Sequence, residues 1–413
     1  RPEIPTNTIS FTHGERLPDS FPDVKSAAFT AIFQYRMTSP PSLGILDLSD
    51  RGAGFVRRRQ FSYLAEDGDL YVAPRLVSQF GLRTGDELWG EVGRAPGRNK
   101  APPVERVTLV NGLPAEGARQ RPAFGSLGAI HPDEPLFLDC GLRRFGQPDY
   151  TNRVIDLFCP FGKGQRALIV APAKAGKTMV LQSVAEGVAK NLPKAMLLIL
   201  LVDERPEEVT EMEMVGYGEV IASSFDFPAE RHVAVAELTL ERARRRVEQG
   251  EDVVLILDSI TRLARAYNTV ERGTGRTMTG GLDSSALEKP KRFLGSARRI
   301  DEAKGGGSLT IIATALIDTG SKMDQVIYEE FKGTGNSELT LSRELAERRI
   351  FPAIDLKASG TRREELLLSP ELLKISQTLR GRFAPMTPVD AMQQVLTLMR
   401  RSATNAEMAG VVS

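Results

Sequence analysis

The strongest chemical signal in the chain is the segment from Ala171 to Thr178, Ala-Pro-Ala-Lys-Ala-Gly-Lys-Thr. It follows an apolar run and precedes a helical pattern, which is the context that a phosphate-binding loop requires. In such a loop the backbone N–H groups face phosphate oxygens, and the helix N-terminus adds its positive dipole end. We expect Lys177 to reach the β- and γ-phosphates and the Thr178 hydroxyl to bind Mg²⁺. Ala171 replaces the first glycine of the strict motif, a modest restriction of backbone freedom.

Carboxylates end two other apolar runs. The run 253–257 leads into Asp258, which in a phosphate-loop enzyme lies beside the loop and holds Mg²⁺. A second run ends at Val202 and leads into Glu204, which we assign to polarise the attacking water. A late glycine-containing loop supplies Arg362 as a candidate cation to neutralise charge in the transition state. Together these residues predict ATP hydrolysis.

The elements that would position these residues alternate apolar strands with helical patterns from residue 151 onward. Continuous apolar runs at 167–170, 196–202, 253–257 and 309–313 fit strands that are buried on both faces of a parallel sheet. The clearest helix is predicted from about 229 to 249, before Gly250. Arg242 and Arg244–Arg246 fall mostly off its apolar stripe, and we interpret them as a solvated helix face.

The N-terminal part has a different pattern. Residues 1–42 are interrupted by prolines and are interpreted as a tail or linker. Residues 43–112 contain five short strand-like pieces separated by turns, which predicts a small barrel. Residues 113–150 are a Gly- and Pro-containing connector, and 151–413 form the α/β domain. Phe55, Arg57 and Tyr71 could form a stacking platform for a single strand, or the aromatic rings could fill the barrel core.

Composition excludes several classes of protein. The chain has 413 residues with 54 Lys and Arg against 53 Asp and Glu, so any binding of a polyanion must come from local patches. The longest apolar run, 195–202, is far shorter than a membrane span, and no secretory signal is evident. Two cysteines and three widely spaced histidines exclude a disulfide scaffold and give no metal-ligand spacing. We therefore expect a cytoplasmic protein with no membrane partner.

Long stretches of the chain resemble the bacterial transcription termination factor Rho family. The resemblance covers the chain from about residue 43 onward and rests on Lys174–Met179, Leu201–Met212, Asp258–Thr269, Ala313–Asp324 and Ile327–Asn336. It implies an α/β RecA-like P-loop motor domain preceded by a small all-β OB-fold barrel, assembled as a homohexamer. The implied activity is an RNA-dependent ATPase and 5′→3′ RNA/DNA helicase that uses ATP and Mg²⁺. It would bind single-stranded nascent RNA and release it from the RNA polymerase elongation complex.

The resemblance also implies site residues. Glu204, Lys177, Asp258 and Arg362 would be catalytic, with Arg362 entering the neighbouring subunit's site; Thr178 and Asp258 would hold the metal. The implied ATP-binding residues are Gly162, Lys163, Gly164, Gln165, Arg166, Ala167, Lys174, Ala175, Gly176, Lys177, Thr178, Met179, Arg205 and Phe351, the last packing on the adenine. The outer RNA site would use Gly52, Ala53, Gly54, Phe55, Val56, Arg57, Asp69, Leu70, Tyr71, Asn99, Lys100 and Ala101. The RNA channel loops would use Arg276, Thr277, Met278, Thr279, Gly280, Gly281 and Lys322.

Some positions depart from the family pattern. Ala53 and Ala101 stand where aromatic residues are usual, which predicts a shallower base pocket, and Arg57 is expected to add a salt-dependent phosphate contact. Residues 214–218 differ from the usual basic stretch, and the usual N-terminal helical subdomain is not evident in residues 1–40. From the residues alone, Gly280–Gly281 is a flexible turn and Lys322 a surface lysine.

Two alternative functions remain open at this point. One is another RecA-type ring ATPase, such as a rotary or export motor or a recombinase, which RNA-stimulated ATP hydrolysis would distinguish. The other is a non-enzymatic RNA-binding protein. The complete set Lys177, Thr178, Glu204 and Asp258 argues against the second alternative.

Overall fold

The structure is a computed structural model, and it describes residues 41–97, 100–271, 281–283 and 285–412. Residues 42–413 form one compact unit. The expectations for the tail, for Asn99 and for Arg276–Gly280 lie outside the described residues. Among the described helices, none is both long enough and apolar enough to cross a membrane.

The first domain is a six-stranded antiparallel sheet with strand order β3-β2-β1-β4-β5-β6. Its strands are β1 (Gly44–Leu48), β2 (Gly54–Arg57), β3 (Leu70–Val72), β4 (Glu87–Val92), β5 (Val104–Val110) and β6 (Leu113–Pro114), with helix α2 (Pro74–Phe80) after β3. Alternate residues such as Leu46, Val56 and Val72 point into one apolar core, as period-2 patterning requires. The sheet continues to Pro114, beyond the boundary predicted at residue 112, and Ala115 packs into the same core.

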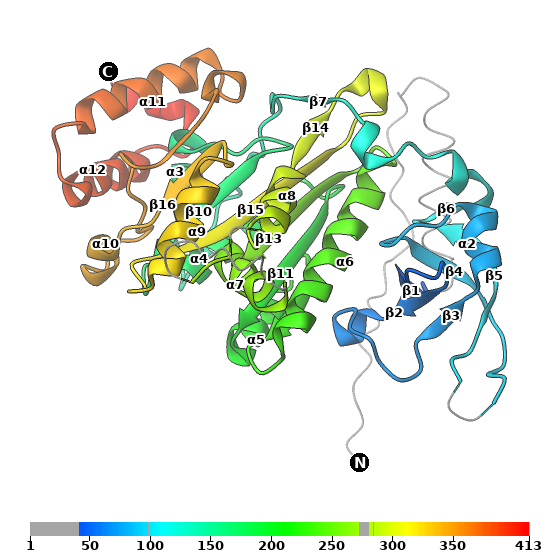
Figure 1. Cartoon of the computed structure of the whole chain (residues 1–413). Helices are drawn as coiled ribbons and strands as arrows, with labels where there is room; N and C mark the ends of the chain where they lie inside the picture. Colours follow the sequence, from blue (N-terminus) through cyan, green and yellow to red (C-terminus); the bar gives the residue numbers. More distant parts are fainter. Residues whose placement is uncertain (1–40, 98–99, 272–280, 284, 413) are drawn as a thin grey trace, which may run out of the picture. The chain divides into compact units, whose positions relative to one another are not determined.

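The second domain is built on a larger sheet with strand order β12-β11-β13-β15-β10-β16-β17. Figure 1 labels the central strands β11, β13, β15, β10 and β16. These strands are β12 (Glu219–Ser224), β11 (Met196–Glu204), β13 (Asp252–Asp258), β15 (Ser308–Ile317), β10 (Arg166–Pro172), β16 (Ser337–Thr340) and β17 (Gly360–Thr361). All neighbours up to β16 are parallel, and β17 is antiparallel. The four predicted apolar strands are confirmed, because each apolar run is buried on both faces of the sheet.

Connector residues extend this sheet. Strand β14 (Arg298–Ile300) pairs antiparallel with β15, and β7 (Ala129–Ile130) pairs with β14. The remaining hairpin is β8 (Arg143–Arg144) and β9 (Gln147–Pro148). The connector is therefore partly a component of the nucleotide domain.

Helices cover both faces of the large sheet. They are α3 (Thr151–Phe158), α4 (Lys177–Asn191), α5 (Pro206–Val215), α6 (Ala229–Val247), α7 (Ile260–Val270), α8 (Glu288–Gly295), α9 (Lys322–Lys332), α10 (Arg343–Glu347), α11 (Pro370–Phe383), α12 (Pro388–Arg400) and α13 (Ala409–Val412). Short 3-10 segments are η1 (Arg59–Phe61), η2 (Ala115–Gln120), η3 (Phe124–Ser126), η4 (Glu302–Lys304), η5 (Glu364–Leu366) and η6 (Ala406–Met408). One apolar core contains side chains of α3, α4, α11 and α12, and the other those of α6, α7, α8 and α9.

The interpretation of the α6 arginines as a solvated face is wrong. Arg242, Arg245 and Arg246 are only 4%, 7% and 6% exposed. Arg242 donates to the Tyr63 hydroxyl and to Glu219, both at 2.6 Å, and Arg246 donates to the Asn111 carbonyl at 2.9 Å. The barrel and its following loop cover the helix face that does not pack on the sheet. Burial of these guanidinium groups is possible because each has a hydrogen-bonding partner.

Candidate nucleotide site and RNA-binding surface

The phosphate loop lies between the end of β10 and the start of α4. Lys174 and Gly176 adopt positive φ angles of 64° and 85°, which turn the backbone sharply just before Lys177 begins the helix. Such a turn directs successive N–H groups into one hollow at the positive end of the helix. Ala171 lies within β10, so its extended conformation does not require the glycine of the strict motif.

Three charged groups meet at this edge of the sheet. The Lys177 ammonium lies 3.0 Å from Glu204 Oε1 and 2.7 Å from Asp258 Oδ1. Glu204 is the last residue of β11 and Asp258 the last residue of the adjacent strand β13, so parallel pairing brings their side chains to the same edge. On β15, Thr314 Oγ1 donates to Asp258 Oδ1 at 2.6 Å and helps to hold this carboxylate. The structure therefore brings together three of the four predicted catalytic residues.

The electrostatics of Glu204 suit a proton acceptor. Its side chain is almost fully buried, and burial, followed by the nearby charge of Asp258, raises its pKa to about 7. Burial opposes the charge on Lys177, but Asp258 and Glu204 outweigh it and hold the pKa of Lys177 above its usual value. Arg262 Nη2 lies 3.4 Å from Glu204 Oε2. A carboxylate with a pKa near the working pH can both accept and release a proton.

Two more predicted nucleotide residues border the loop. A Cβ placed on Gly176 would lie 3.4 Å from the Phe351 ring, so this partly exposed ring lies directly against the loop. Arg205 follows Glu204, precedes α5 and is exposed. Met179 lies in the first turn of α4, and Ala175, a residue of the loop itself, is buried.

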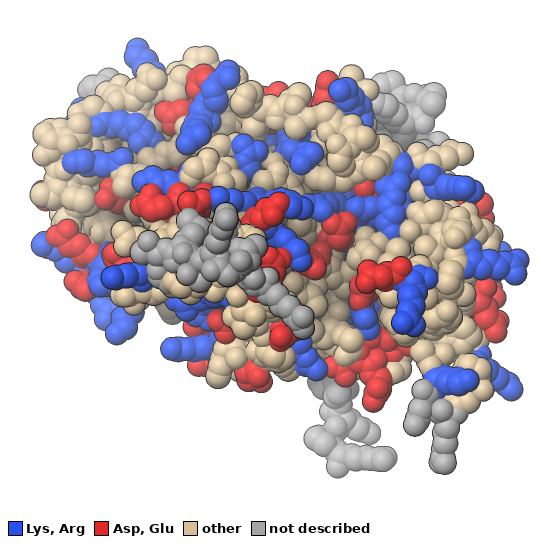
Figure 2. All heavy atoms as spheres, in the orientation of Figure 1, with Lys and Arg blue, Asp and Glu red and all other residues tan. Residues whose placement is uncertain are grey.

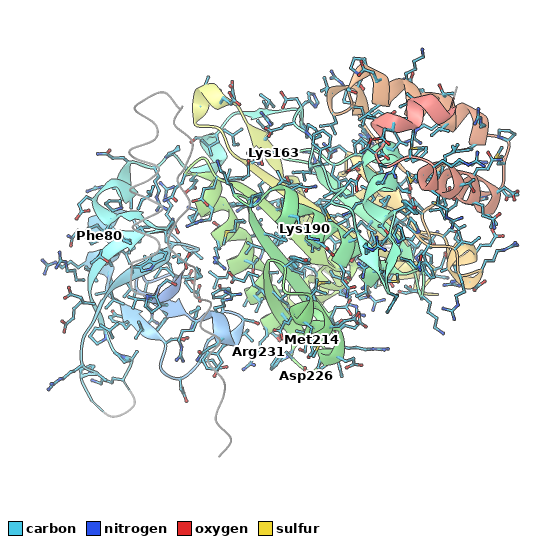
Figure 3. The ribbon with its side chains drawn as sticks, turned by 180° about the vertical axis from the view of Figure 1, so that it is seen from behind. Phe80, Lys163, Lys190, Met214, Asp226 and Arg231 are labelled. Carbon is cyan, nitrogen blue, oxygen red and sulfur yellow. The ribbon has the colours of Figure 1, made fainter. Side chains whose placement is uncertain are left out.

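Residues 162–167 are not brought to the phosphate loop. They lie at the start of β10, and the seven residues of that strand place the loop about 20 Å away at the other edge. Lys163 pairs with Glu134 and with Asp252, the first residue of β13. Figure 3 shows Lys163 at one end of the large sheet and Met214, on α5, at the other. Within one chain these residues cannot contact the same phosphates as Lys177.

Arg362 also lies at the edge opposite the loop. It follows β17, and its backbone N–H donates to the Asn336 carbonyl at 2.9 Å. Arg166 donates its backbone N–H to the Asn336 side chain at 2.8 Å, and burial and then the charge of Arg362 lower the pKa of Arg166. In the described part of the chain no carboxylate pairs with either arginine. Arg362 is therefore an exposed, unneutralised cation.

The barrel presents two aromatic rings side by side. Phe55 on β2 is paired directly with Tyr71 on β3, and their ring centroids are 6.0 Å apart at 65°. Both side chains are partly exposed. The backbone N–H of Tyr71 donates to the Pro102 carbonyl at 2.8 Å. This hydrogen bond brings the segment that carries Ala101 beside Tyr71. The arrangement has the elements of a stacking platform.

Several other residues of the predicted outer site belong to the barrel structure around the two rings. Val56 is fully buried and Leu70 packs against the barrel core, so neither side chain extends toward a ligand. A Cβ on Gly54 would collide with Leu46 at 2.6 Å. Gly52 is an exposed turn residue with a φ of 77°, whereas Ala53 is partly buried and Lys100 is exposed.

The charge of Arg57 is neutralised in place. Its guanidinium binds Asp47 at 2.7 Å and Asp69 at 2.8 Å and lies 5.4 Å from the centre of the Phe55 ring. Burial opposes its charge, but the hydrogen bonds that it donates to Asp69 and Asp47 hold its pKa above the usual value. Asp69 is itself buried. Arg57 is thus placed to orient the platform.

Of the two described channel residues, Lys322 begins helix α9 and Gly281 lies in the segment between α7 and α8. Lys322 is the exposed first residue of α9, next to a loop held by the buried Asp324, which binds Arg265 at 2.8 Å and Thr319 at 2.6 Å. Gly281 accepts a long hydrogen bond from Asn268 at 3.4 Å.

Sequence reasoning missed Arg262, Thr314 and Asp47. Arg262 had a signal, because it stands one helical turn after Asp258. The other two depend on strand pairing between distant segments. Within the described residues no group of three or more His, Cys, Asp or Glu could hold a metal ion.

The fold and site define a P-loop ATPase domain joined to a small β domain. Residues 151–361 match the model of the ATP synthase alpha/beta family, nucleotide-binding domain, and residues 42–116 match that of the Rho termination factor, RNA-binding domain. The solved ATPase of a type III secretion system superposes with a TM-score of 0.54 at 23% identity, covering 69% of this chain and 86% of that one. The assembled ATPase EscN of enteropathogenic E. coli gives 0.53 at 25% identity, covering 65% of this chain and 61% of that one. These likenesses concern the fold.

Other proteins have a much higher sequence identity to this chain than these two solved structures. Transcription termination factor Rho of Gemmatimonas aurantiaca is 56% identical over 355 residues, which are 86% of this chain and 48% of that protein. Rho of Buchnera aphidicola from Schizaphis graminum is 51% identical over 364 residues, covering 88% of this chain and 86% of the relative. Rho of Escherichia coli K12 is 51% identical over 362 residues, covering 88% and 85%. The chain spans about half the length of the first relative and most of the other two, and it belongs to the transcription termination factor Rho family.

Proposed function

We propose that this chain is an RNA-dependent ATPase and 5′→3′ RNA/DNA helicase that terminates transcription by releasing nascent RNA from the RNA polymerase elongation complex in the cytoplasm. The observation that carries the proposal is the contact of Lys177 with Glu204 and Asp258 at a phosphate loop, in a chain that also contains a Rho RNA-binding domain. The export and rotary motors share the fold, but the RNA-binding domain and the sequence identity favour the Rho activity.

ATP binding would change the partners of Lys177. In the structure its ammonium group pairs with the carboxylates of Glu204 and Asp258. When ATP binds, the ammonium group would instead contact the phosphate oxygens. Glu204 would then be released to orient and deprotonate the attacking water, for which a pKa near neutrality is suited. Phe351 would pack on the adenine, and Arg205 would lie beside the phosphates.

The residues at the loop fit a magnesium ion. Thr178 is partly exposed in the first turn of α4, and Asp258 supplies carboxylate oxygens at the neighbouring strand end. Oxygen ligands of this kind, together with substrate phosphates, are what Mg²⁺ prefers. When bound, Mg²⁺ neutralises developing charge on the transferred phosphoryl group.

The position of Arg362 supports assembly of several copies. Arg362 and the phosphate loop lie at opposite edges of one sheet, so they can meet only when the edge of one copy faces the loop of another. A closed ring satisfies this arrangement for every copy. We infer a homohexamer in which Arg362, with Arg166 beside it, completes the nucleotide site of the neighbouring subunit.

Three experiments test the proposal. ATP hydrolysis should be much faster with single-stranded RNA than without it; equal rates would contradict an RNA-dependent motor.

Arg362→Ala should lower the rate of ATP hydrolysis by about 10³–10⁵. Rings mixed from Arg362→Ala and Lys177→Ala subunits should exceed both parents, because some interfaces pair an intact loop with an intact arginine. Mixtures no more active than the parents, with subunit exchange verified, would contradict action between subunits.

A further inference from the structure

A groove of about 700 Å³ separates the barrel from helices α6, α7 and α8. Its barrel side includes Arg57, which lies against the Phe55 ring of the platform. Its other side includes Tyr267 of α7 and Lys289 and Arg292 of α8. Helices α7 and α8 flank the chain segment that carries Gly281. The groove thus begins at the outer platform and ends at the helices that support a channel loop.

Exposed cations line the far end of this groove. Lys289 and Arg292 have side chains that are 50% and 69% exposed. Lys289 lies 3.2 Å from the partly buried Glu271 and 3.5 Å from the half-exposed Glu237, and Arg292 binds the exposed Glu288. Ion pairs of this kind contribute little, so phosphate groups can replace the carboxylates at small cost. Figure 2 shows basic and acidic side chains interspersed on the face that it presents.

The carboxylates inside the groove already have partners. Asp47 binds Arg57, Glu241 binds Arg244 at 2.5 Å and Arg245 at 2.9 Å, and Glu237 accepts a hydrogen bond from Tyr267 at 3.0 Å. Asp47 and Glu241 are thus compensated by arginines that are more buried than Lys289 and Arg292, whereas Glu237 lies 3.5 Å from Lys289. Lys289 and Arg292 are more exposed than the groove arginines Arg57 and Arg244, so a polyanion entering the groove would contact them by displacing Glu237, Glu271 and Glu288.

Among the described residues that line the groove, no aromatic side chain is exposed for bases. Tyr63, Tyr267 and Phe293 line it, but they are only 5%, 2% and 2% exposed. A larger groove of about 870 Å³ also includes Tyr63, and its lining has three arginines, Arg58, Arg59 and Arg242, beside three glutamates, Glu87, Glu213 and Glu219. The smaller groove is therefore suited to a phosphate backbone that passes through without base recognition.

We propose that this groove holds the single-stranded RNA segment that runs from the barrel platform to the channel, with Lys289 and Arg292 contacting its phosphates. The proposal rests on the proposed function, because it assumes that both sites bind one RNA. It predicts binding that depends on salt and not on base identity.

The test compares Lys289→Ala/Arg292→Ala with the control Lys291→Ala. Lys291 lies on the same helix, pairs with Glu330 of α9 and does not line the groove. Poly(C) long enough to span both sites is one ligand. The other is a pair of short C-oligonucleotides supplied together, so that each site is filled separately. Affinity, its salt dependence and stimulated ATPase are measured for each variant.

We expect the double variant to bind the long RNA several-fold more weakly, with a salt slope reduced by about 1.4, since each lost phosphate contact on a single strand reduces it by about 0.7. Activation by the two short oligonucleotides should stay at the wild-type level, and the charge-conserving variant Lys289→Arg should retain binding of the long RNA. An unchanged slope in the double variant, or equal loss with long and short RNA, would overturn the proposal. Absence of RNA stimulation in the wild type would instead overturn the proposed function.

Discussion

Lys177 in the nucleotide domain and Arg57 in the barrel are each held between two carboxylates. Lys177 lies 3.0 Å from Glu204 and 2.7 Å from Asp258, and Arg57 lies 2.7 Å from Asp47 and 2.8 Å from Asp69. Both cations are 15% exposed. The carboxylates differ in position: those of Lys177 end two parallel strands beside the phosphate loop, whereas Asp47 lies on β1, paired with the strand that carries Arg57.

The comparison shows that local pairing does not define the role of a cation. At the nucleotide site the surrounding loop is built to receive phosphates, so a ligand can replace the carboxylates and change the state of Glu204. In the barrel the two carboxylates pair with Arg57 beside the Phe55 ring, and we expect its charge to stay compensated when RNA approaches. Binding there should depend on Phe55 and Tyr71 more than on charge.

The largest effects are expected at the nucleotide site. Glu204→Gln keeps the shape of the side chain but removes the proton acceptor, so ATP should bind while turnover falls by about 10²–10⁴. Lys177→Ala should weaken both nucleotide binding and turnover, because it removes a phosphate contact. Nucleotide titration and single-turnover hydrolysis separate the two cases.

Glu207→Gln is the matched control for Glu204→Gln. Glu207 is an exposed residue in the first turn of α5, and its substitution should leave turnover unchanged. Near-normal turnover in Glu204→Gln would remove Glu204 from the mechanism and direct attention to Asp203.

The aromatic platform should give the next largest effect. Phe55→Ala or Tyr71→Ala is expected to weaken RNA binding about fivefold to a hundredfold at all salt concentrations, since a base–aromatic stack contributes about 1–3 kcal/mol. Phe61→Ala, which removes an exposed ring outside the β2–β3 pair, is the control. Fluorescence titration with C-rich and A-rich strands also measures base preference, which the alanines at 53 and 101 should weaken. Unchanged affinity in both platform variants would place the stacking elsewhere.

A pH profile tests the charge state of Glu204. Its pKa is raised to about 7 by burial and by Asp258, and only the deprotonated form can accept a proton from water. We therefore expect kcat/KM for ATP to rise with pH, about tenfold per unit below about 7, and to level off above it. The residual activity of Glu204→Gln should lack this rise. A flat wild-type profile through this range would be inconsistent with Glu204 as the base.

The smallest effect is expected for Arg57. The sequence pattern predicts a phosphate contact whose loss flattens the salt dependence, but Asp47 and Asp69 compensate the charge of Arg57. Arg57→Ala should weaken RNA binding a few-fold through loss of order at Phe55, with little change in salt slope. Lys100→Ala, at an exposed lysine, should reduce the slope by about 0.7. A reduction of that size in Arg57→Ala would show that Arg57 contacts phosphate directly.

The elements and the chemistry of the nucleotide site could be predicted from the chain because their signals are local. The loop at 171–178 lies between an apolar strand and a helix, and Glu204 and Asp258 each follow a continuous apolar run. Parallel strands end at one edge of their sheet, so a carboxylate at the end of each strand is placed near the loop without further information.

The features that could not be predicted depend on contacts between distant segments. The arginines of α6 are buried because the barrel covers a helix face whose composition alone indicates solvent. Arg57 is neutralised because the register of β1 against β2 places Asp47 within reach. Arg362 lies away from the loop because β17 runs antiparallel to β16 and leads back to the end of the sheet where β10 and β16 begin. The periodicity of the sequence shows which face of a helix or strand is apolar. Whether its polar face is buried or exposed depends on which other segment of the chain packs against it. That choice depends on strand order and register, which the chain sets only when it is folded.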